Sequence, residues 1–380
     1  MKKLSVLVIA TLVAMGSFAQ NINVQTAFNH HKKGKLKEAL EAIQPALEHS
    51  QTSMQPKTWY YYANICSAIS QDATGAYNGL LANPLDEAAR GYAKALELDK
   101  KEEYTDEITG RMRGIASLYS NKGVTAYEAK LYPEAAENFA KSYEVTEQLN
   151  QPNLSMLRYA GTCWLDAENW DKAEVVYIKL KEANYNDASI YIGLAKIAVE
   201  KKELNKAVKY LDEGEEKYPT DLGFLGEKAN MYLLNEELSK LDKHAALNTL
   251  KKIVEIEPKN ATVWYNLGDC YAKDSTKSNE AVAAYKKCIE LDPKFISAYY
   301  GYSNIYLDKA NHYIKEANDL PLSADKEYDA LIKQAEAIFM EVLPFIEQAY
   351  ELNSSDAGVK QLLKEIYTRL KMMDKAAEIK

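Results

Sequence analysis

Alanine recurs at one position of a pattern that is repeated along most of this chain. In several copies it follows a small residue by twelve positions and precedes a large apolar residue by four, as in Gly123, Ala135 and Phe139. The alanines at this position are Ala39, Ala88, Ala135, Ala173, Ala207, Ala246, Ala281 and Ala376. A period of roughly 34 residues with this signature is typical of stacked helical hairpins, each of which buries its apolar face against its neighbours. The pattern therefore predicts an all-α fold of antiparallel helix hairpins.

The pattern is most complete between residues 261 and 295. This segment carries, in order, Trp264, Leu267, Gly268, Tyr271, Ala281, Tyr285, Cys288 and Pro293. It resembles the tetratricopeptide repeat (TPR) family, and residues 188–221 follow the same pattern closely. The resemblance implies a right-handed α-solenoid in which small residues let the two helices of a hairpin cross closely. Large residues would fill the space between hairpins, and the proline would end the second helix.

On these registers we expect residues 20–380 to form a single solenoid. The expected repeats are 20–53, 56–101, 116–149, 154–187, 188–221, 222–260, 261–295 and 296–354, with a partial capping unit at 357–380. Residues 67–86 interrupt the second repeat and are predicted to form a loop with a short helical turn. Residues 307–340 interrupt the eighth and are predicted to lengthen both of its helices, with Pro344 kinking the second. In that repeat Val342 stands where the others have alanine.

Residues 1–19 have the three parts of a secretory signal peptide. Lys2 and Lys3 form a basic start, an apolar centre follows, and Ser17 and Ala19 make a small-x-small cleavage site. We therefore expect an exported protein, periplasmic or secreted, with no membrane span after cleavage. The apolar stretch is too short to be a convincing membrane span. A retained amphipathic anchor is the alternative to cleavage.

Charge and cysteine placement narrow the expected partners. The net charge is −8 at pH 7 and no basic stripe stands out, so nucleic-acid binding is not expected. Most of the four cysteines (Cys66, Cys163, Cys270 and Cys288) fall at packed positions of the repeat, which predicts buried thiols that act as small apolar side chains. A Cys270–Cys288 disulfide within one hairpin is the alternative.

No catalytic motif is present. The sequence contains no HExxH, no GxGxxG, no phosphate-binding P-loop, no GxSxG and no paired CxxC. His30 and His31 lie beside two lysines at the expected end of the first helix, where cations meet the negative end of the helix dipole. We interpret them as a solvated helix end and not as a metal site. The sequence predicts no enzyme activity, no metal and no cofactor.

The expected binding surface is the concave groove that the resemblance implies. In a TPR stack the first helix of each hairpin lines this groove, mainly through positions 5, 9 and 12. The candidate residues are Tyr60, Asn64, Tyr127, Arg158, Thr162, Asn230, Tyr265, Asp269, Tyr300 and Asn304. Tyrosine offers a rigid apolar face with a polar tip, and asparagine can pair with the backbone of an extended peptide. Position 5 lacks the lysine of the family's carboxylate-binding members, so that binding mode is not expected.

These observations favour a non-catalytic scaffold in the cell envelope. It would bind a peptide or helix of another protein through the groove or through the inserted helices near residues 307–340. Two alternatives stay open. One is a structural protein whose repeats self-assemble, and the other is a carbohydrate-binding module that uses the groove tyrosines. In the final unit, Lys360 and Lys364 replace the aromatic residue and the glycine of the repeat. We expect such polar substitutions on an outward face to form a cap, which argues against end-to-end stacking.

Overall fold

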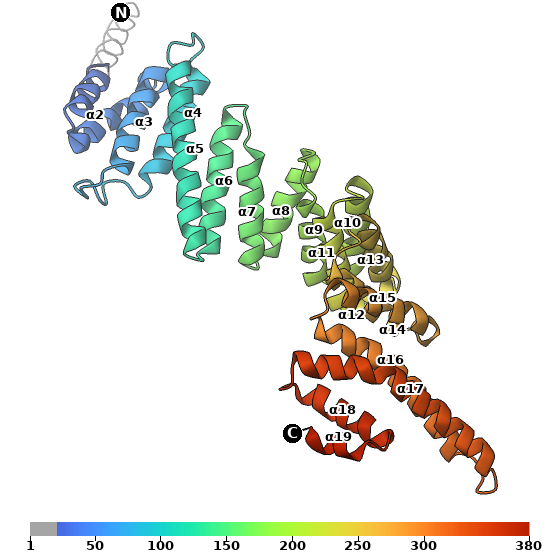
Figure 1. The fold of residues 1–380 in the computed structure, drawn as a ribbon. Coiled ribbons are helices and arrows are strands. Elements are labelled where there is room, and N and C mark those ends of the chain that lie inside the picture. Colours follow the sequence, from blue (N-terminus) through green and yellow to red (C-terminus); the bar gives the residue numbers. More distant parts are fainter. Residues whose placement is uncertain (1–20, 380) are drawn as a thin grey trace, which may run out of the picture. The chain divides into compact units, whose positions relative to one another are not determined.

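The computed structural model describes residues 21–379, and these residues form helices joined by turns, without a β-strand. The predicted all-α solenoid of stacked helix hairpins is confirmed. The described residues divide into two compact units, and the boundary between Gly193 and Leu194 falls within α9 (Ser189–Glu200). Figure 1 labels the helices of both units. The predicted signal peptide at residues 1–19 lies outside the described residues.

Unit 1 begins with a helix through residues 21–32 and continues as antiparallel helix pairs. Its further helices are α2 (Leu36–Glu48), the short 3-10 helix η1 (Thr52–Met54), α3 (Pro56–Ser70), α4 (Pro84–Leu98), α5 (Thr105–Glu128), α6 (Tyr132–Gln148), α7 (Leu154–Asp166) and α8 (Trp170–Glu182). The first helix of the third hairpin, α5, thus begins well before residue 116. Sequence patterning missed this extension because residues 105–115 carry no repeat signature.

The insertion in unit 1 differs from the expectation. Residues 71–83 form turns and bends between α3 and α4, and the predicted short helical turn is wrong. Gly75 and Gly79 adopt φ of +74° and +80°, a left-handed conformation that ends helical hydrogen bonding. The loop is anchored by the Tyr77 hydroxyl, which donates to the carbonyl of Gly34 at 2.6 Å.

Unit 2 continues from α9 with further hairpins. Its helices are α10 (Leu204–Lys217), α11 (Leu222–Leu234), α12 (Glu236–Leu241), α13 (Ala245–Ile256), α14 (Ala261–Ala272), η2 (Ser275–Lys277), α15 (Ser278–Leu291), α16 (Ile296–Asn318), α17 (Asp325–Leu352), α18 (Ala357–Arg369) and α19 (Met373–Glu378). The lengthened helices predicted around residues 307–340 are confirmed as α16 and α17, and α17 continues through Pro344.

One turn geometry joins the two helices of the regular hairpins. A single residue takes a left-handed conformation after the first helix. The amide of the following residue then donates a hydrogen bond to a carbonyl in the last turn of that helix. After α5, Lys130 has φ of +60°, and the amide of Leu131 donates to the carbonyl of Ala126 at 2.8 Å. The equivalent residues elsewhere are Gly34, Glu168, Lys202 and Lys371. This is a Schellman-type C-cap, which satisfies helix-terminal carbonyls and reverses the chain within a few residues.

Aromatic residues of the second helices pack against glycines of the first helices. A Cβ atom at Gly268 in α14 would lie 2.7 Å from the ring of Tyr285, and one at Gly301 in α16 would collide with the same ring. Tyr177 stands in the same way between Gly161 and Gly193. The predicted role of small residues as points of close approach is thus confirmed, because each glycine makes room for an aromatic ring shared by successive hairpins.

The alanine series is buried with one exception. Ala39, Ala135 and Ala281 have no exposed surface, and Val342 is as buried as the alanines that it replaces. Ala246 is only half-buried, whereas the adjacent Ala245 is buried. The assignment of Ala246 to the packed position is therefore wrong. The short helix α12 replaces the tight turn of this hairpin. The next helix, α13, starts at Ala245 and buries Ala245 in place of Ala246.

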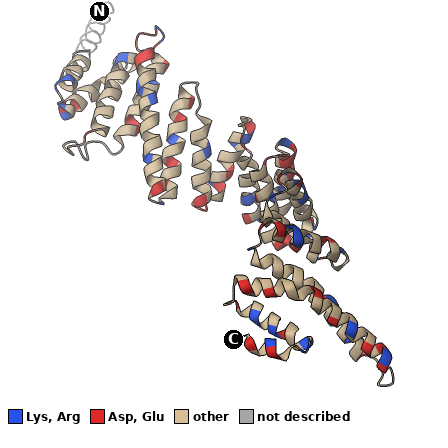
Figure 2. Cartoon of the chain, viewed as in Figure 1, with Lys and Arg blue, Asp and Glu red and all other residues tan. Residues whose placement is uncertain are grey.

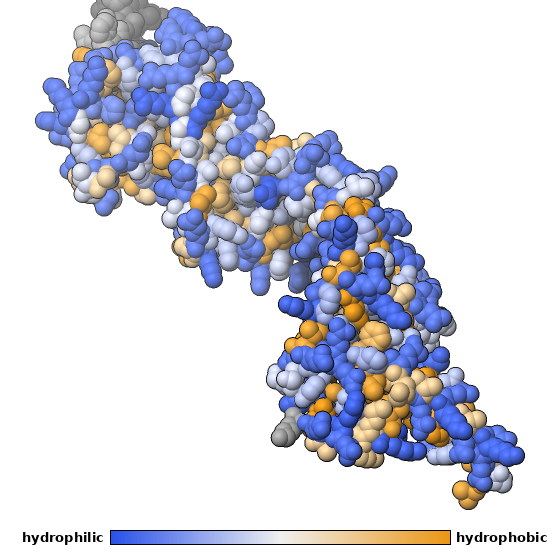
Figure 3. All heavy atoms as spheres, in the orientation of Figure 1, coloured by the Kyte–Doolittle hydropathy of each residue, from blue (hydrophilic) through white to orange (hydrophobic). Residues whose placement is uncertain are grey.

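The exterior is polar and of mixed charge. Lys and Arg residues are interspersed with Asp and Glu along the helices in Figure 2, and the face shown in Figure 3 is mainly hydrophilic with scattered apolar residues. At the turn between α16 and α17, Leu322 is fully exposed. None of the helices in residues 21–379 is long and apolar enough to cross a membrane.

All four cysteines are free thiols. Cys66, Cys163 and Cys288 are buried and Cys270 is half-buried, which matches the predicted packing role and leaves the alternative disulfide unformed. Burial raises the pKa of Cys66 and of Cys163 to about 12 and that of Cys288 to about 11. The reactive thiolate is therefore scarce at neutral pH.

We expect the three buried thiols to react with Ellman's reagent at pH 8 roughly 100-fold more slowly in the native protein than in the denatured chain, because both burial and the raised pKa suppress thiolate attack. In denaturant without reductant, all four thiols should titrate. A stoichiometry of two would contradict this structure and indicate a Cys270–Cys288 bridge.

Candidate functional site

Four of the predicted groove residues meet in one pocket of unit 2. Tyr265 and Asp269 come from α14, and Tyr300 and Asn304 come from α16, the first helix of the next hairpin. In each helix the two residues are four apart, so their side chains lie on the same face. The pocket has a volume of about 380 Å³, and its remaining lining residues are Ala272, Tyr285, Ser297, Gly301, Ile305 and Asp308. We call it the tyrosine–aspartate pocket.

The walls of this pocket are held in place by hydrogen bonds and ring contacts. The buried Tyr285 hydroxyl donates to Asp269 at 2.6 Å, and the Tyr300 hydroxyl donates to Asp356 at 2.5 Å. Asp356 caps α18 at the same time by accepting from the amides of Gly358 and Val359. The ring of Tyr265 lies 5.1 Å from that of Phe295 and 5.9 Å from that of Tyr285. Both accessible tyrosines are therefore oriented before any ligand arrives.

The tyrosine hydroxyls of the pocket stay protonated over the whole physiological range. Burial, with the charge of Asp269, raises the pKa of Tyr265 to about 12. Burial and the hydrogen bond to Asp356 raise the pKa of Tyr300 further above its ordinary value. The Asn304 side chain is exposed and makes no hydrogen bond to a described residue. The site thus offers aromatic faces, an open amide and carboxylates.

Two further predicted residues, Tyr60 and Asn64, line a separate pocket of unit 1. Its volume is about 430 Å³, and its other lining residues are Phe28, His31, Lys32, Tyr61, Ser67, Ala68, Gln71, Tyr92, Glu107 and Arg111. Tyr60 is buried, and the Asn64 side-chain oxygen accepts a hydrogen bond from Tyr92 at 2.5 Å. Burial and the nearby Arg111 lower the pKa of His31. Tyr60 and Asn64 are therefore less available to a ligand than Tyr300 and Asn304 in the pocket of unit 2.

The other predicted residues lie outside both pockets. Tyr127 is exposed and packs on Tyr132. Arg158 pairs with Asp187 at 3.4 Å and lies over the ring of Tyr159. Thr162 is half-buried on α7, and Asn230 is exposed on α11. The structure thus separates the ten candidates into two pockets and a remainder.

Sequence reasoning missed several lining residues because they lie beyond the ordinary repeat. Asp308 stands one turn after Asn304, on the part of α16 that extends past a normal first helix. Glu107 and Arg111 lie on the early part of α5. The sequence could have indicated these lining residues only through the unusual lengths of α5 and α16. Among residues 21–379, no group of three or more His, Cys, Asp or Glu side chains is arranged to hold a metal ion.

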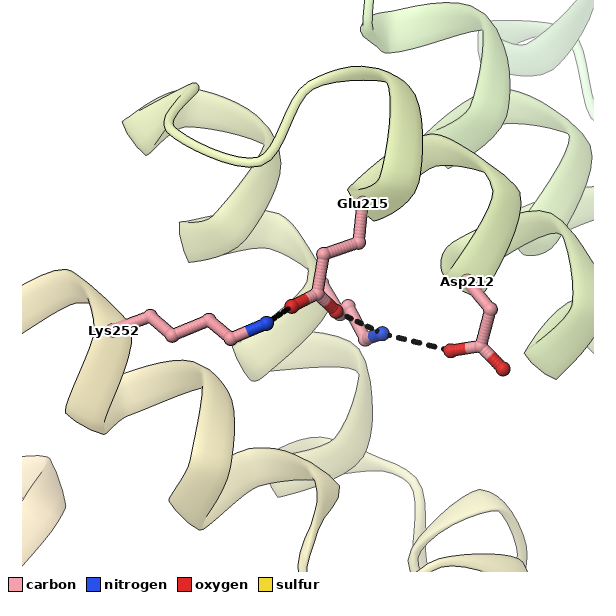
Figure 4. Close-up of polar contacts among 4 residues, drawn as sticks. Asp212, Glu215 and Lys252 are labelled. Atoms are coloured by element: carbon pink, nitrogen blue, oxygen red, sulfur yellow. Dashed lines mark hydrogen bonds and ion pairs between the residues drawn. The ribbon is translucent and has the colours of Figure 1, made fainter.

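A buried ion cluster in unit 2 was also missed. Lys228 on α11 occupies the repeat position at which residues 261–295 have Leu267, and its side chain is only 5% exposed. Its ammonium group contacts Asp212 at 2.9 Å and Glu215 at 2.5 Å, both on α10, and Glu215 also binds Lys252 on α13 (Figure 4). The cluster therefore ties three helices together and compensates a charge in the core.

Comparison with known families is consistent with this architecture. The profile described as "Tetratricopeptide repeat" matches residues 261–295, which are the hairpin α14–α15 that contributes Tyr265, Asp269 and Tyr285 to the pocket. Residues 261–295 are thus similar to a tetratricopeptide repeat. The TPR fold supports a general role as a scaffold for protein–protein interaction.

Two solved structures are similar to about half of this chain at low sequence identity. YrrB, described as a TPR protein with an unusual peptide-binding site, is 20% identical over 56% of this chain and 97% of its own, with a TM-score of 0.36. MamA is 18% identical over 54% of this chain and 94% of its own, with a TM-score of 0.38. No curated protein matches the chain.

Proposed function

We propose that this TPR protein is a non-catalytic, exported scaffold that binds an extended segment of a partner protein in the tyrosine–aspartate pocket. The observation that carries the proposal is the meeting of Tyr265, Asp269, Tyr300 and Asn304 from successive first helices. Rigid tyrosine rings supply contact area at low entropic cost, and an open asparagine can pair with a peptide backbone. The proposed export rests on the signal-like sequence of residues 1–19 alone.

A non-catalytic role fits the chemistry of the pocket. Its lining residues include no histidine, lysine or cysteine that could activate Ser297, and Asp269 is engaged by the Tyr285 hydroxyl. Its aromatic faces, amide and carboxylates can hold a ligand. Binding is therefore the function that this geometry supports best.

Capture from a native envelope extract, with quantitative mass spectrometry of the bound proteins, tests the proposal. The double variant Tyr265→Ala with Asn304→Ala should capture about tenfold less partner than the natural protein, because central aromatic contacts dominate such interfaces. The matched control is Tyr127→Ala with Asn230→Ala, which changes the same residue types outside both pockets. Helicity should be equal in both variants.

Two outcomes would contradict the proposal. Capture by the pocket variant equal to that of the natural protein would place the binding site elsewhere on the chain. Binding of envelope oligosaccharides, lost in the pocket variant alone, would show that the same pocket serves a carbohydrate ligand instead of a peptide.

A further inference from the structure

The tyrosine–aspartate pocket carries negative charge without compensation. Asp269 and Asp308 both line it, and no lysine, arginine or histidine does. Neither carboxylate forms an ion pair with any residue in the described part of the chain. In the pocket of unit 1, by contrast, Glu107 is paired with Arg111 and two further basic side chains contribute to the lining. Of these two pockets, only that of unit 2 therefore has no basic side chain in its lining and carboxylates without an ion pair.

The position of Asp269 makes the missing counter-charge significant. This side chain is half-buried, and the hydrogen bond from Tyr285 fixes one of its oxygens. A partly buried carboxylate loses part of its hydration, which raises the free energy of its charged form. A cation that binds there forms a charge-assisted hydrogen bond, which stabilises the carboxylate more than the remaining water does. Asp308 lies at the exposed rim of the same pocket, where it attracts a cation as it approaches.

The aromatic walls are also free of cations. Across the described chain, lysines and arginines repeatedly lie over aromatic rings, such as Lys172 at 4.0 Å from the centre of the Trp164 ring and Arg158 at 4.5 Å from that of Tyr159. No described lysine or arginine lies over Tyr265 or Tyr300. These two rings thus have no cation from the described chain over them, so a cation that stacks on them would have to come from a ligand.

We propose that this pocket recognises a basic side chain of the partner segment, with arginine preferred over lysine. The inference rests on the proposed peptide-binding function and names the chemistry of its ligand. A planar guanidinium can lie on a tyrosine face while its N–H groups bind a carboxylate, whereas an ammonium group is a more strongly hydrated point charge. Asp269 and Asp308 would bind the cation, Tyr265 and Tyr300 would flank its plane, and Asn304 would pair with the adjacent backbone.

Selection of a phage-displayed library of random decapeptides on the purified protein tests this inference. Selected peptides should be enriched in arginine at one position. Replacement of that arginine by glutamine should weaken binding about tenfold or more in fluorescence polarisation, because it removes one desolvated charge contact. For the variant Asp269→Asn with Asp308→Asn, the arginine and glutamine peptides should bind within about twofold of each other. The control Glu255→Gln with Glu327→Gln removes the same charge from exposed positions outside the pocket and should keep the preference.

The outcomes separate this inference from the function on which it rests. Peptides that depend on Tyr265 and Asn304 but show no preference for a basic residue would overturn the inference and leave the scaffold function standing. Equal loss of arginine preference in both charge variants would reduce the effect to general electrostatic attraction and also overturn it. Selected peptides that bind undiminished to the Tyr265→Ala, Asn304→Ala variant, or a library that yields no binder, would contradict the peptide-binding function itself.

Discussion

Replacing Glu215 by alanine should lower the free energy of unfolding by about 3–5 kcal/mol, because it leaves the buried Lys228 ammonium with only the exposed Asp212 as its partner. Lys228 is 5% exposed, so water cannot replace the lost carboxylate. Urea denaturation followed by circular dichroism at pH 7 measures the effect. The expected change is several times that of a typical surface ion pair.

The reciprocal variant separates a buried charge from a general packing defect. Lys228→Met places an apolar side chain of similar length where the repeats at 188–221 and 261–295 have leucine, and Glu215 keeps Lys252 as a partner. Its stability should equal or exceed that of the natural protein. Combining Lys228→Met with Glu215→Ala should recover most of the loss. Similar destabilisation by both single variants would show that the cluster is not a compensated charge but an essential packing element.

The contacts of Glu215 with Lys228 and Lys252 also predict that the stabilisation by Glu215 depends on pH. Burial acts to raise the pKa of Glu215, but the hydrogen bonds and charges of Lys228 and Lys252 outweigh it and hold this pKa below its usual value of 4.5. A carboxyl whose pKa is lower in the folded state contributes its stability above the unfolded pKa and loses it as the pH falls through the folded value. The difference between the natural protein and Glu215→Ala should therefore shrink below about pH 4.5.

Tyr285→Ala should destabilise unit 2 by about 3–5 kcal/mol, because it removes a ring that is only 2% exposed and packed against two helices. The glycines beside it, Gly268 and Gly301, carry no side chain that could fill the space. Thermal or urea unfolding measures the loss. A change below about 1 kcal/mol would mean that α14 and α16 close over the cavity.

Tyr285→Phe is the matched control for this prediction. It keeps the ring and removes only the hydroxyl that donates to Asp269, so its cost should be about 1 kcal/mol. In this variant Asp269 also loses the contact that orients it in the tyrosine–aspartate pocket. Arginine-peptide affinity should therefore fall while most of the stability remains, which distinguishes the positioning role of the hydroxyl from the packing role of the ring.

Particular elements show how far sequence patterning reaches. Regularly spaced alanines and glycines identified the hairpins, because close helix crossings accept only small side chains, and Ala39, Gly123 and Ala281 lie where that rule places them. The rule failed at Ala246, where α12 alters the entry into α13. It also missed the early part of α5 and the cluster around Lys228, since a charged residue at an apolar position has no meaning until its partners are known.

For the candidate site, the periodicity of single helices placed Tyr265 and Asp269 on one face, and Tyr300 and Asn304 on another. Local periodicity depends only on helical geometry, and it is readable from the sequence. Only the tertiary structure decided that these two faces meet in one pocket, that Tyr60 is buried, and that Asp308 joins from an extended helix. Such contacts depend on how successive hairpins stack and how long each helix runs, and these are set by packing between residues far apart in the chain.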